Sequence, residues 1–124
     1  ALRMPRESAE ERAARDAALV EATIATIEVP MRTLEACPEI IELCREAGRI
    51  GLAASFSDAG TGSELARAGA AGAYQNVCVN LPGLADRAAA AALLARADAA
   101  WERTRSLHAQ ATAEVLEKLR AAAG

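Results

Sequence analysis

The stretch SDAGTGSELARAGAAGAYQNVCVNLPG, residues 57–83, decides the fold of this chain. Asp58, Glu64 and Arg67 are its only charged residues. A long helix with so few charges has no polar face to turn toward water, so the stretch predicts a buried central helix. Ser57 or Asp58 can cap its start, and the Leu-Pro-Gly at its end stops it because proline cannot continue the hydrogen-bond ladder.

Four glycines lie inside this predicted helix, at positions 60, 62, 69 and 72. Each costs about 1 kcal/mol relative to alanine in a helix interior. Together they indicate that something approaches this backbone closely, either a neighbouring helix or a ligand.

Helical periodicity also governs the chain before this stretch. Ser8 and Glu11 form a capping box that opens an amphipathic helix, which is predicted to run to about Val29. The apolar stripe continues beyond Pro30, so either the helix kinks there or a second helix begins with proline in its first turn. Gly48 is predicted to end this helical segment.

Residues 48–56 are predicted to form the one substantial loop, and residues 85–122 a last helix with a heptad-like seam. No strand alternation appears in the sequence. The prediction is an all-α, antiparallel helical bundle around a buried, Gly/Ala-rich central helix. That helix is too apolar for so few flanking helices to cover, so we also expect a homodimer or a larger homo-oligomer.

Composition excludes several classes of protein. The chain has 124 residues, which is one domain at most, and its net charge of −3 is too small to indicate nucleic-acid or membrane binding. Three cysteines, an odd number, fit a reducing compartment, so we expect a cytoplasmic protein. The chain opens at Ala1 without an initiator methionine, and we expect it to be a piece of a longer protein or a processed chain.

Metal-binding and nucleotide-binding motifs are absent from the sequence. Cys37 and Cys44 are two helical turns apart, too far for a disulfide within one helix, and Cys78 lies in the predicted buried helix. All three are expected to be core thiols, and no metal site is predicted. Trp101 is expected to be the main hydrophobic anchor of the last helix.

Asp58 is the strongest candidate for chemistry because it ends the loop, opens the central helix and follows Ser55 and Ser57. A carboxylate there can cap the helix, act as a general acid or base, or accept a hydrogen bond from a ligand ring nitrogen. Gly60 leaves the first turn open to close approach, and a helix start presents free N–H donors.

Asn76 and Asn80 share one face of the same helix because they are four positions apart. These amides either make a helix–helix hydrogen bond or contact a bound ligand. His108, the only histidine, is expected on the seam or the surface, with a catalytic role only if a partner subunit brings a carboxylate to it.

Two motifs carry a resemblance: SDAG at residues 57–60 and GAYQNVCVNL at residues 72–81. With the Val29-Pro30 step and the long charged last helix, they make the whole chain similar to the formiminotransferase-cyclodeaminase C-terminal domain family, which includes bacterial methenyltetrahydrofolate cyclohydrolases. The resemblance implies an all-helical fold that dimerises. It also implies one-carbon folate chemistry.

In that family, cyclodeaminases close 5-formiminotetrahydrofolate to 5,10-methenyltetrahydrofolate with loss of ammonia, and cyclohydrolases interconvert the methenyl and 10-formyl forms with water. The resemblance implies no metal and no cofactor beyond the tetrahydrofolate derivative that is the substrate. It makes Asp58 the proton-transfer group or the residue that orients the pterin. The substrate-binding residues would then be Ser55, Ser57, Gly60, Asn76 and Asn80.

Family members also carry an N-terminal helical portion with a Pro-Gly-Gly-Gly-Ser-like stretch, which this sequence lacks. Residues 1–124 are therefore expected to be a single helical domain, the C-terminal portion of a longer one. Two alternatives stay open: the same fold acting on another substrate, and a non-catalytic helical dimerisation module. Arg45, Arg49 and Arg67 can attract an anionic folate tail, although a solvated surface is the better explanation for each of them.

Overall fold

The computed structural model describes residues 2–124, apart from the side chain of Ala53. This part of the chain forms three α-helices, α1 (Ala9–Ile50), α2 (Phe56–Asn80) and α3 (Arg87–Ala123), joined by two short connections. Each connection contains a 3-10 turn, η1 (Ala53–Ser55) and η2 (Leu81–Gly83). No strand occurs between residues 2 and 124, so the all-α prediction is confirmed.

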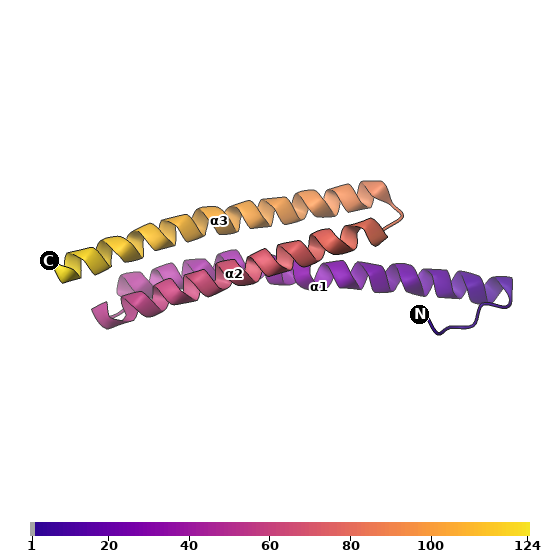
Figure 1. Ribbon diagram of the computed structural model, residues 1–124, viewed down its shortest axis with the longest axis horizontal. Helices are drawn as coiled ribbons and strands as arrows, with labels where there is room; N and C mark the ends of the chain where they lie inside the picture. The colour runs from indigo at the N-terminus through magenta and orange to yellow at the C-terminus, as the bar shows by residue number, and fades with distance from the viewer. Residues whose placement is uncertain (1) are drawn as a thin grey trace.

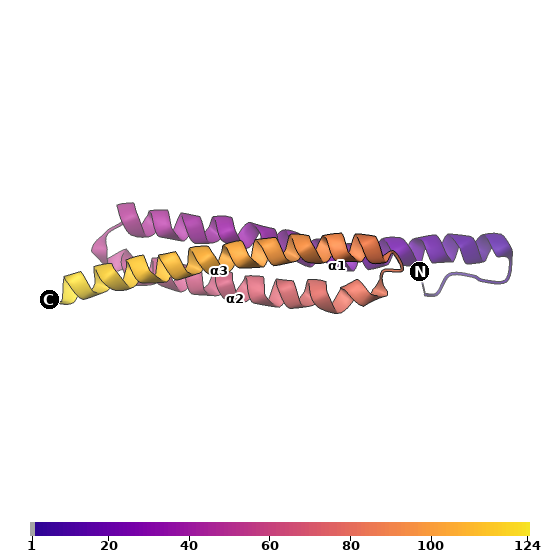
Figure 2. The same ribbon diagram turned by 90° about the horizontal axis from the view of Figure 1, so that it is seen from above.

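The three helices lie side by side in alternating directions, and together they make an elongated array (Figure 1). The view from above gives the same order, with α2 running back along α1 and α3 running back along α2 (Figure 2). In both views the first turns of α1 extend beyond the α2–α3 connection. The antiparallel arrangement follows from the short connections, because a helix that follows a short loop packs antiparallel to the helix before it.

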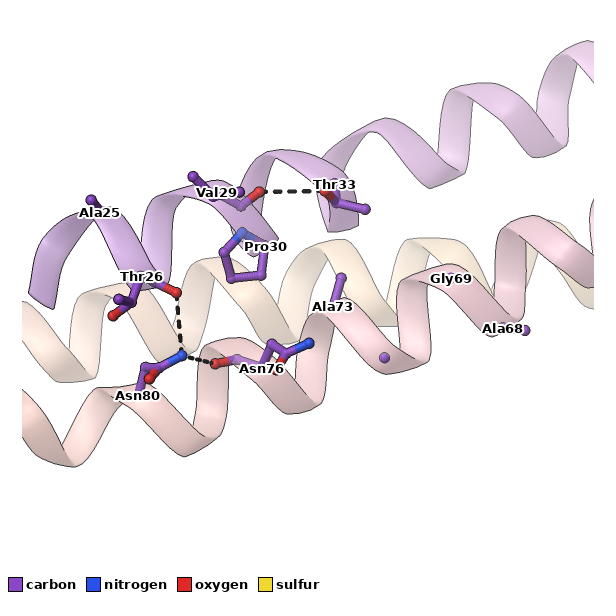
Figure 3. A pocket seen from close by; sticks show the side chains of 11 residues that line it. Ala25, Thr26, Val29, Pro30, Thr33, Ala68, Gly69, Ala73, Asn76 and Asn80 are labelled. Atoms are coloured by element: carbon purple, nitrogen blue, oxygen red, sulfur yellow. Dashed lines mark hydrogen bonds between the residues drawn. The ribbon is translucent and has the colours of Figure 1, made fainter. Parts of the chain in front are cut away.

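Helix α1 starts as predicted and ends later than predicted. The Ser8 hydroxyl accepts from the Glu11 amide at 3.1 Å, and the Glu11 carboxylate accepts from the Ser8 amide at 3.0 Å. The helix then continues through Pro30 and Pro38 to Ile50, so the alternative of a second helix beginning at Pro30 is wrong (Figure 3). The buried stripe runs on both sides of these prolines, and its burial outweighs the local cost of proline.

Gly48 is also wrong as the end of α1, because it lies buried inside the last turns of the helix and Gly51 is the C-cap. A Cβ at Gly48 would stand 3.5 Å from the Cβ of Ala59 on α2. This is an ordinary van der Waals distance, so the end of α1 packs directly on the start of α2. The connection shortens to residues 51–55 as a result.

Helix α2 begins at Phe56 with Ser55 as its N-cap, so the prediction that Ser57 or Asp58 caps the start is wrong. Both lie inside the first turn, where the Asp58 carboxylate meets the positive end of the helix dipole. The end is as predicted, since Asn80 is followed directly by the Leu-Pro-Gly turn. Helix α3 is capped by Asp86, whose carboxylate accepts from two backbone amides, at 2.9 and 3.0 Å.

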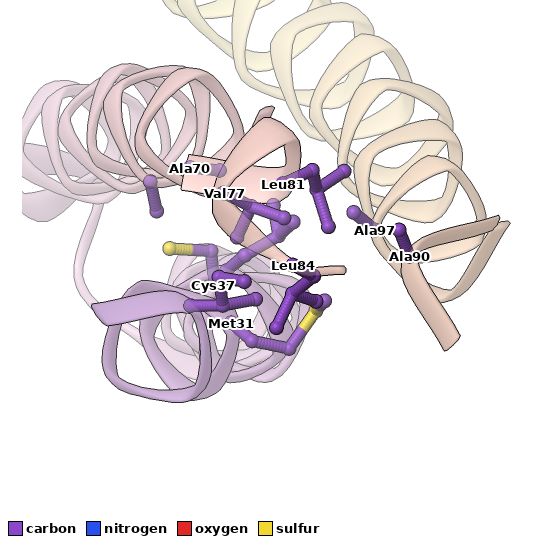
Figure 4. Packing of buried hydrophobic residues seen from close by; sticks show 11 residues of the cluster. Met31, Cys37, Ala70, Val77, Leu81, Leu84, Ala90 and Ala97 are labelled. Atoms are coloured by element: carbon purple, nitrogen blue, oxygen red, sulfur yellow. The ribbon is translucent and has the colours of Figure 1, made fainter. Parts of the chain in front are cut away.

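The main core lies between the three helices (Figure 4). Large side chains come from α1, from the end of α2 and from the α2–α3 connection, whereas α3 contributes only alanines to the buried cluster. Alanine buries little area but lets α3 approach closely. The buried residues of the cluster are Ile27, Met31, Leu34, Cys37, Ala70, Ala73, Val77, Leu81, Leu84, Ala90 and Ala97. Trp101 packs half-buried against this cluster and stacks on Tyr74, with ring centroids 5.9 Å apart.

Helix α2 is buried on one side only. The face toward α1 and α3 carries its buried residues, among them Ala66, Ala70 and Val77. On the opposite face, Leu65 is 68% exposed and Val79 is 71% exposed. Full burial of this helix, as the sequence predicts, would therefore need something beyond the three helices of one chain.

The four glycines of α2 divide into two pairs. A Cβ at Gly62 would lie 2.8 Å from the Cys44 sulfur on α1, and a Cβ at Gly60 would lie 3.1 Å from Val115 on α3. At these two positions a neighbouring helix approaches the backbone, which is one of the two explanations that the sequence leaves open. At Gly69 and Gly72, no atom of the described residues lies within 4 Å of an added Cβ.

Candidate functional site

The open pair of glycines faces a groove between α1 and α2 (Figure 3). The groove has a volume of about 720 Å³ and is mostly apolar, with asparagine amides at one end. Its α1 wall passes through Pro30, and its α2 wall carries the exposed Gly69. The lining residues are Ala25, Thr26, Val29, Pro30, Thr33, Ala68, Gly69, Gly72, Ala73, Asn76 and Asn80.

The two asparagines have different roles in this groove. The Asn80 amide nitrogen donates across the groove to the Thr26 carbonyl at 3.2 Å, and to the Asn76 carbonyl at 2.8 Å. A helix–helix hydrogen bond, one of the two predicted roles, is therefore present at Asn80. The Asn76 side chain is exposed and makes no hydrogen bond within residues 2–124, so its amide is free to meet a ligand.

The other predicted site residues lie at the opposite end of α2. Ser57 and Asp58 are exposed, while Ser55 and Gly60 are half-buried. Eighteen positions separate Asp58 from Asn76, about 27 Å along a helix axis. One chain therefore brings Ser55, Ser57, Asp58 and Gly60 together, and separately Asn76 and Asn80, but it does not bring the two groups together.

The arginines near the start of α2 are engaged within the chain. Arg45 donates to Glu114 at 2.5 Å and to Glu42 at 2.9 Å, and Arg49 donates to Glu114 at 3.2 Å. The hydrogen bond from Arg45 lowers the pKa of Glu114, and burial opposes it. Arg67 pairs with Glu64 on its own helix at 3.5 Å. These charges are already compensated, so none of the three is a free anion-binding group.

Lys118 lies beside the start of α2 as well. Its ammonium stands 4.7 Å from the centre of the Phe56 ring, a cation–π distance, and donates to the Gly48 carbonyl. The contact joins the C-terminal part of α3 to both ends of the α1–α2 connection.

His108 meets a carboxylate from its own chain. Its Nε2 lies 2.8 Å from Glu64 on α2, and this hydrogen bond lowers the pKa of Glu64. The histidine side chain is only 16% exposed, as a seam position predicts. The sequence allowed a carboxylate beside His108 only through a partner subunit, as a condition for a catalytic role, because it does not show which residue of α2 faces position 108.

Tyr74, within the second motif, points toward α3. Its hydroxyl donates to Asp98 at 2.7 Å, and this hydrogen bond, together with burial, raises the pKa of the phenol well above its usual value. The phenol is therefore a fixed donor that links α2 to α3. Sequence reasoning did not single it out as a contact.

The cysteines are free thiols, and Cys37 belongs to the main core, as predicted. Cys44 and Cys78 are only half-buried and lie outside the core clusters, so the prediction of core thiols is wrong for these two. Burial raises the pKa of Cys37 and of Cys44. Over residues 2–124, no three His, Cys, Asp or Glu side chains gather into a group that could hold a metal ion.

Comparison with known proteins adds what geometry alone does not provide. The family model described as Formiminotransferase-cyclodeaminase matches residues 1–99. The chain belongs to this family. A curated relative, the methenyltetrahydrofolate cyclohydrolase of Methylorubrum extorquens, is 39% identical over 85 residues, which are 68% of this chain and 41% of the relative.

The region that matches the formiminotransferase-cyclodeaminase family covers α1, α2 and the beginning of α3. Asp58, the two asparagines and the α1–α2 groove all lie inside it, whereas His108 lies beyond it. The family assignment inferred from the two motifs is confirmed. The chain spans less than half the length of the relative it matches. Among the described helices, none has the length and apolar character to cross a membrane.

Proposed function

We propose that this chain is part of a one-carbon folate enzyme of the methenyltetrahydrofolate cyclohydrolase type. The observation that carries the proposal is the match to the formiminotransferase-cyclodeaminase family, with a named cyclohydrolase at 39% identity. The groove between α1 and α2 supports it, because about 720 Å³ is within the usual size range of small-molecule sites. A largely apolar wall with one free amide suits a heteroaromatic ring such as a pterin.

The reaction requires proton transfers. Water adds to the methenyl carbon of 5,10-methenyltetrahydrofolate, the bond from that carbon to N5 breaks, and 10-formyltetrahydrofolate and one proton result. A carboxylate that takes the proton from water and returns one to N5 is sufficient for this. Asp58 is the proposed carboxylate, and the proposal assigns no metal or redox cofactor. Asn76 orients the ring through its free amide.

Because Asp58 and Asn76 are about 27 Å apart along α2, the proposed site needs a second chain. A two-fold axis that crosses α2 at its midpoint reverses the partner's α2 and places the start of one beside the end of the other. The midpoint between positions 58 and 76 is 67, two residues from the exposed Gly69, which leaves the backbone open to a close crossing. The apolar Leu65 and Val79, exposed on the same helix, favour this homodimer.

The direct test is turnover of 5,10-methenyltetrahydrofolate and 5-formiminotetrahydrofolate by the full native chain, with Asp58→Asn measured in parallel. We expect turnover of the methenyl compound and a decrease of about 10²- to 10⁴-fold in kcat for the variant, the usual contribution of a positioned acid or base. Turnover of the formimino compound alone would identify a cyclodeaminase. A folded protein that turns over neither would be a repurposed fold or a helical dimerisation module, and would overturn the proposal.

A further inference from the structure

Pro30 leaves one carbonyl of α1 without its helical donor. In an α-helix the N–H of residue 30 donates to the carbonyl of residue 26, but proline has no N–H. The proline ring also pushes against that carbonyl and turns it away from the helix axis. The Thr26 carbonyl therefore needs a donor from outside α1, and it lies on the groove.

Asn80 supplies that donor. Its amide nitrogen is 3.2 Å from the Thr26 carbonyl, and its second N–H is used by the Asn76 carbonyl one turn earlier on α2, at 2.8 Å (Figure 3). Both donors of the amide are therefore engaged, and only its oxygen remains as an acceptor. Asn76, one turn away on the same wall, has no such engagement among the described residues.

A second contact holds the same part of α1 from the other side. Arg96 of α3 donates to Glu35 at 2.5 and 2.7 Å and to Glu28 at 3.0 Å. These two glutamates lie on either side of Pro30, so one guanidinium spans the position where the helix lacks its hydrogen bond. Helix α1 is therefore held at its proline from α3 by Arg96 and from α2 by Asn80.

We propose that Asn80 is a positioning residue: it replaces the hydrogen bond that Pro30 removes from α1, and so holds the proline wall of the groove at a set distance from the free Asn76 amide. This assignment differs from the substrate contact that family resemblance suggests for Asn80. It rests on the proposed function only for the identity of what the groove binds. The hydrogen bond itself is a property of the ligand-free chain.

The decisive experiment is a double-mutant cycle between Asn80→Ala and Pro30→Ala, read by thermal unfolding without ligand. With Pro30 present, Asn80→Ala is expected to lower the midpoint by about 4 °C, the effect of one net hydrogen bond in a chain of this size. In the Pro30→Ala background the backbone at position 30 again donates to Thr26, so Asn80→Ala should cost less than half as much. Equal losses in both backgrounds would overturn the proposal.

Asn76→Ala is the matched control, because it removes the same amide from the same wall of the groove. It is expected to leave the unfolding midpoint unchanged or slightly raised, since its side chain makes no described hydrogen bond and alanine is the better helix former. A loss equal to that of Asn80→Ala would mean that any groove amide stabilises the fold, and would also contradict the proposal.

The kinetic readout separates positioning from direct contact. Asn80→Ala should raise KM about 5-fold with kcat nearly unchanged, and this increase should shrink in the Pro30→Ala background. A KM increase that is the same in both backgrounds would indicate that Asn80 contacts the substrate. If the protein turns over neither folate, the proposed function fails while the unfolding cycle still decides the role of Asn80.

Discussion

The side chains that define this molecule find their partners on other helices. Glu64 and His108 join α2 to α3, and Tyr74 and Asp98 do the same nearer the end of α2. In each case a polar group that is isolated along the sequence meets a complementary group in the fold. These contacts set the rotation of one helix against the next, which apolar packing alone specifies only weakly.

Arg96 provides a test at the scale of one residue. The Arg96 guanidinium donates hydrogen bonds to the Glu35 carboxylate and so lowers the pKa of that carboxylate, while burial acts in the opposite direction. Arg96 and Glu35 are 41% and 37% exposed, so screening by water limits the contribution to about 1 kcal/mol in a bidentate geometry. We expect Arg96→Gln to lower the free energy of unfolding at pH 7 by about this amount.

The pH dependence of that difference has a definite sign. A carboxylate whose pKa is lowered by folding stabilises the fold fully above its unfolded pKa, near pH 4, and the stabilisation is lost as the pH falls through the lower folded value. The gap between wild type and Arg96→Gln, measured by urea unfolding, should therefore be constant from about pH 6 to 8 and close below about pH 4. Arg105→Gln, which breaks an exposed pair with Glu102 on one helix, should show no such gap. A gap that persists unchanged to pH 3 would rule out the pair as its source.

The four glycines of α2 decide which parts of this helix pack closely against its neighbours. The space beside its first two glycines is occupied by side chains of α1 and α3, and its last two glycines face the open groove. The same residue type therefore serves internal packing at one end of the element and leaves room for something else at the other. Only the neighbours of each glycine distinguish the two uses.

Two alanine substitutions test this division. Gly69→Ala should raise the free energy of unfolding of the dilute chain by about 0.5–1 kcal/mol, because it removes the helix cost of glycine and meets no described atom. Gly62→Ala should be less stable than Gly69→Ala by about 1 kcal/mol or more, because the new methyl overlaps the Cys44 sulfur and this overpacking offsets the helix gain. Urea unfolding of both variants at low protein concentration is the measurement.

The same Gly69→Ala variant reports on self-association. Its methyl group would lie beside the proposed crossing point of two α2 helices, so the dimer dissociation constant should rise, as sedimentation equilibrium can measure. An unchanged dissociation constant would mean that the two α2 helices do not cross near Gly69. Lower stability of the dilute variant would contradict the assignment of Gly69 to an open wall.

At the scale of the whole molecule, one chain is an elongated array that leaves apolar side chains uncovered. Leu43 on α1 is 70% exposed, in addition to Leu65 and Val79 on α2. The proposed homodimer would cover part of this exposed apolar surface. The two family motifs, at the start and at the end of α2, also remain apart in one chain.

A mixing experiment tests whether two chains share a site. Asp58→Asn and Asn76→Ala should each lower kcat/KM severely when they are assembled alone. If the residues meet across a two-fold axis, random mixing gives heterodimers with one intact site, and activity should recover toward about a quarter of wild type. Recovery would require exchange of subunits, which fluorescence transfer between labelled chains can follow. No recovery after full exchange would mean that Asp58 and Asn76 do not belong to one shared site.

Local signals in the sequence determined the elements of this protein. The capping box at Ser8, the scarcity of charge in residues 57–83 and the proline at position 82 each act within a few residues of where they stand. Such signals depend on backbone hydrogen bonds and side-chain periodicity, which are the same in any helical context. The two motifs of α2 also determined the family without reference to the fold.

Only the tertiary structure decided how α1 passes Pro30 and what the asparagines do. The continuous helix depends on buried residues on both sides of the proline, and the role of Asn80 depends on the Thr26 carbonyl of another helix. The partner of His108 depends likewise on the register of α2 against α3. Register and rotation between helices follow from the packing of all the side chains at once, so no local stretch of sequence carries them.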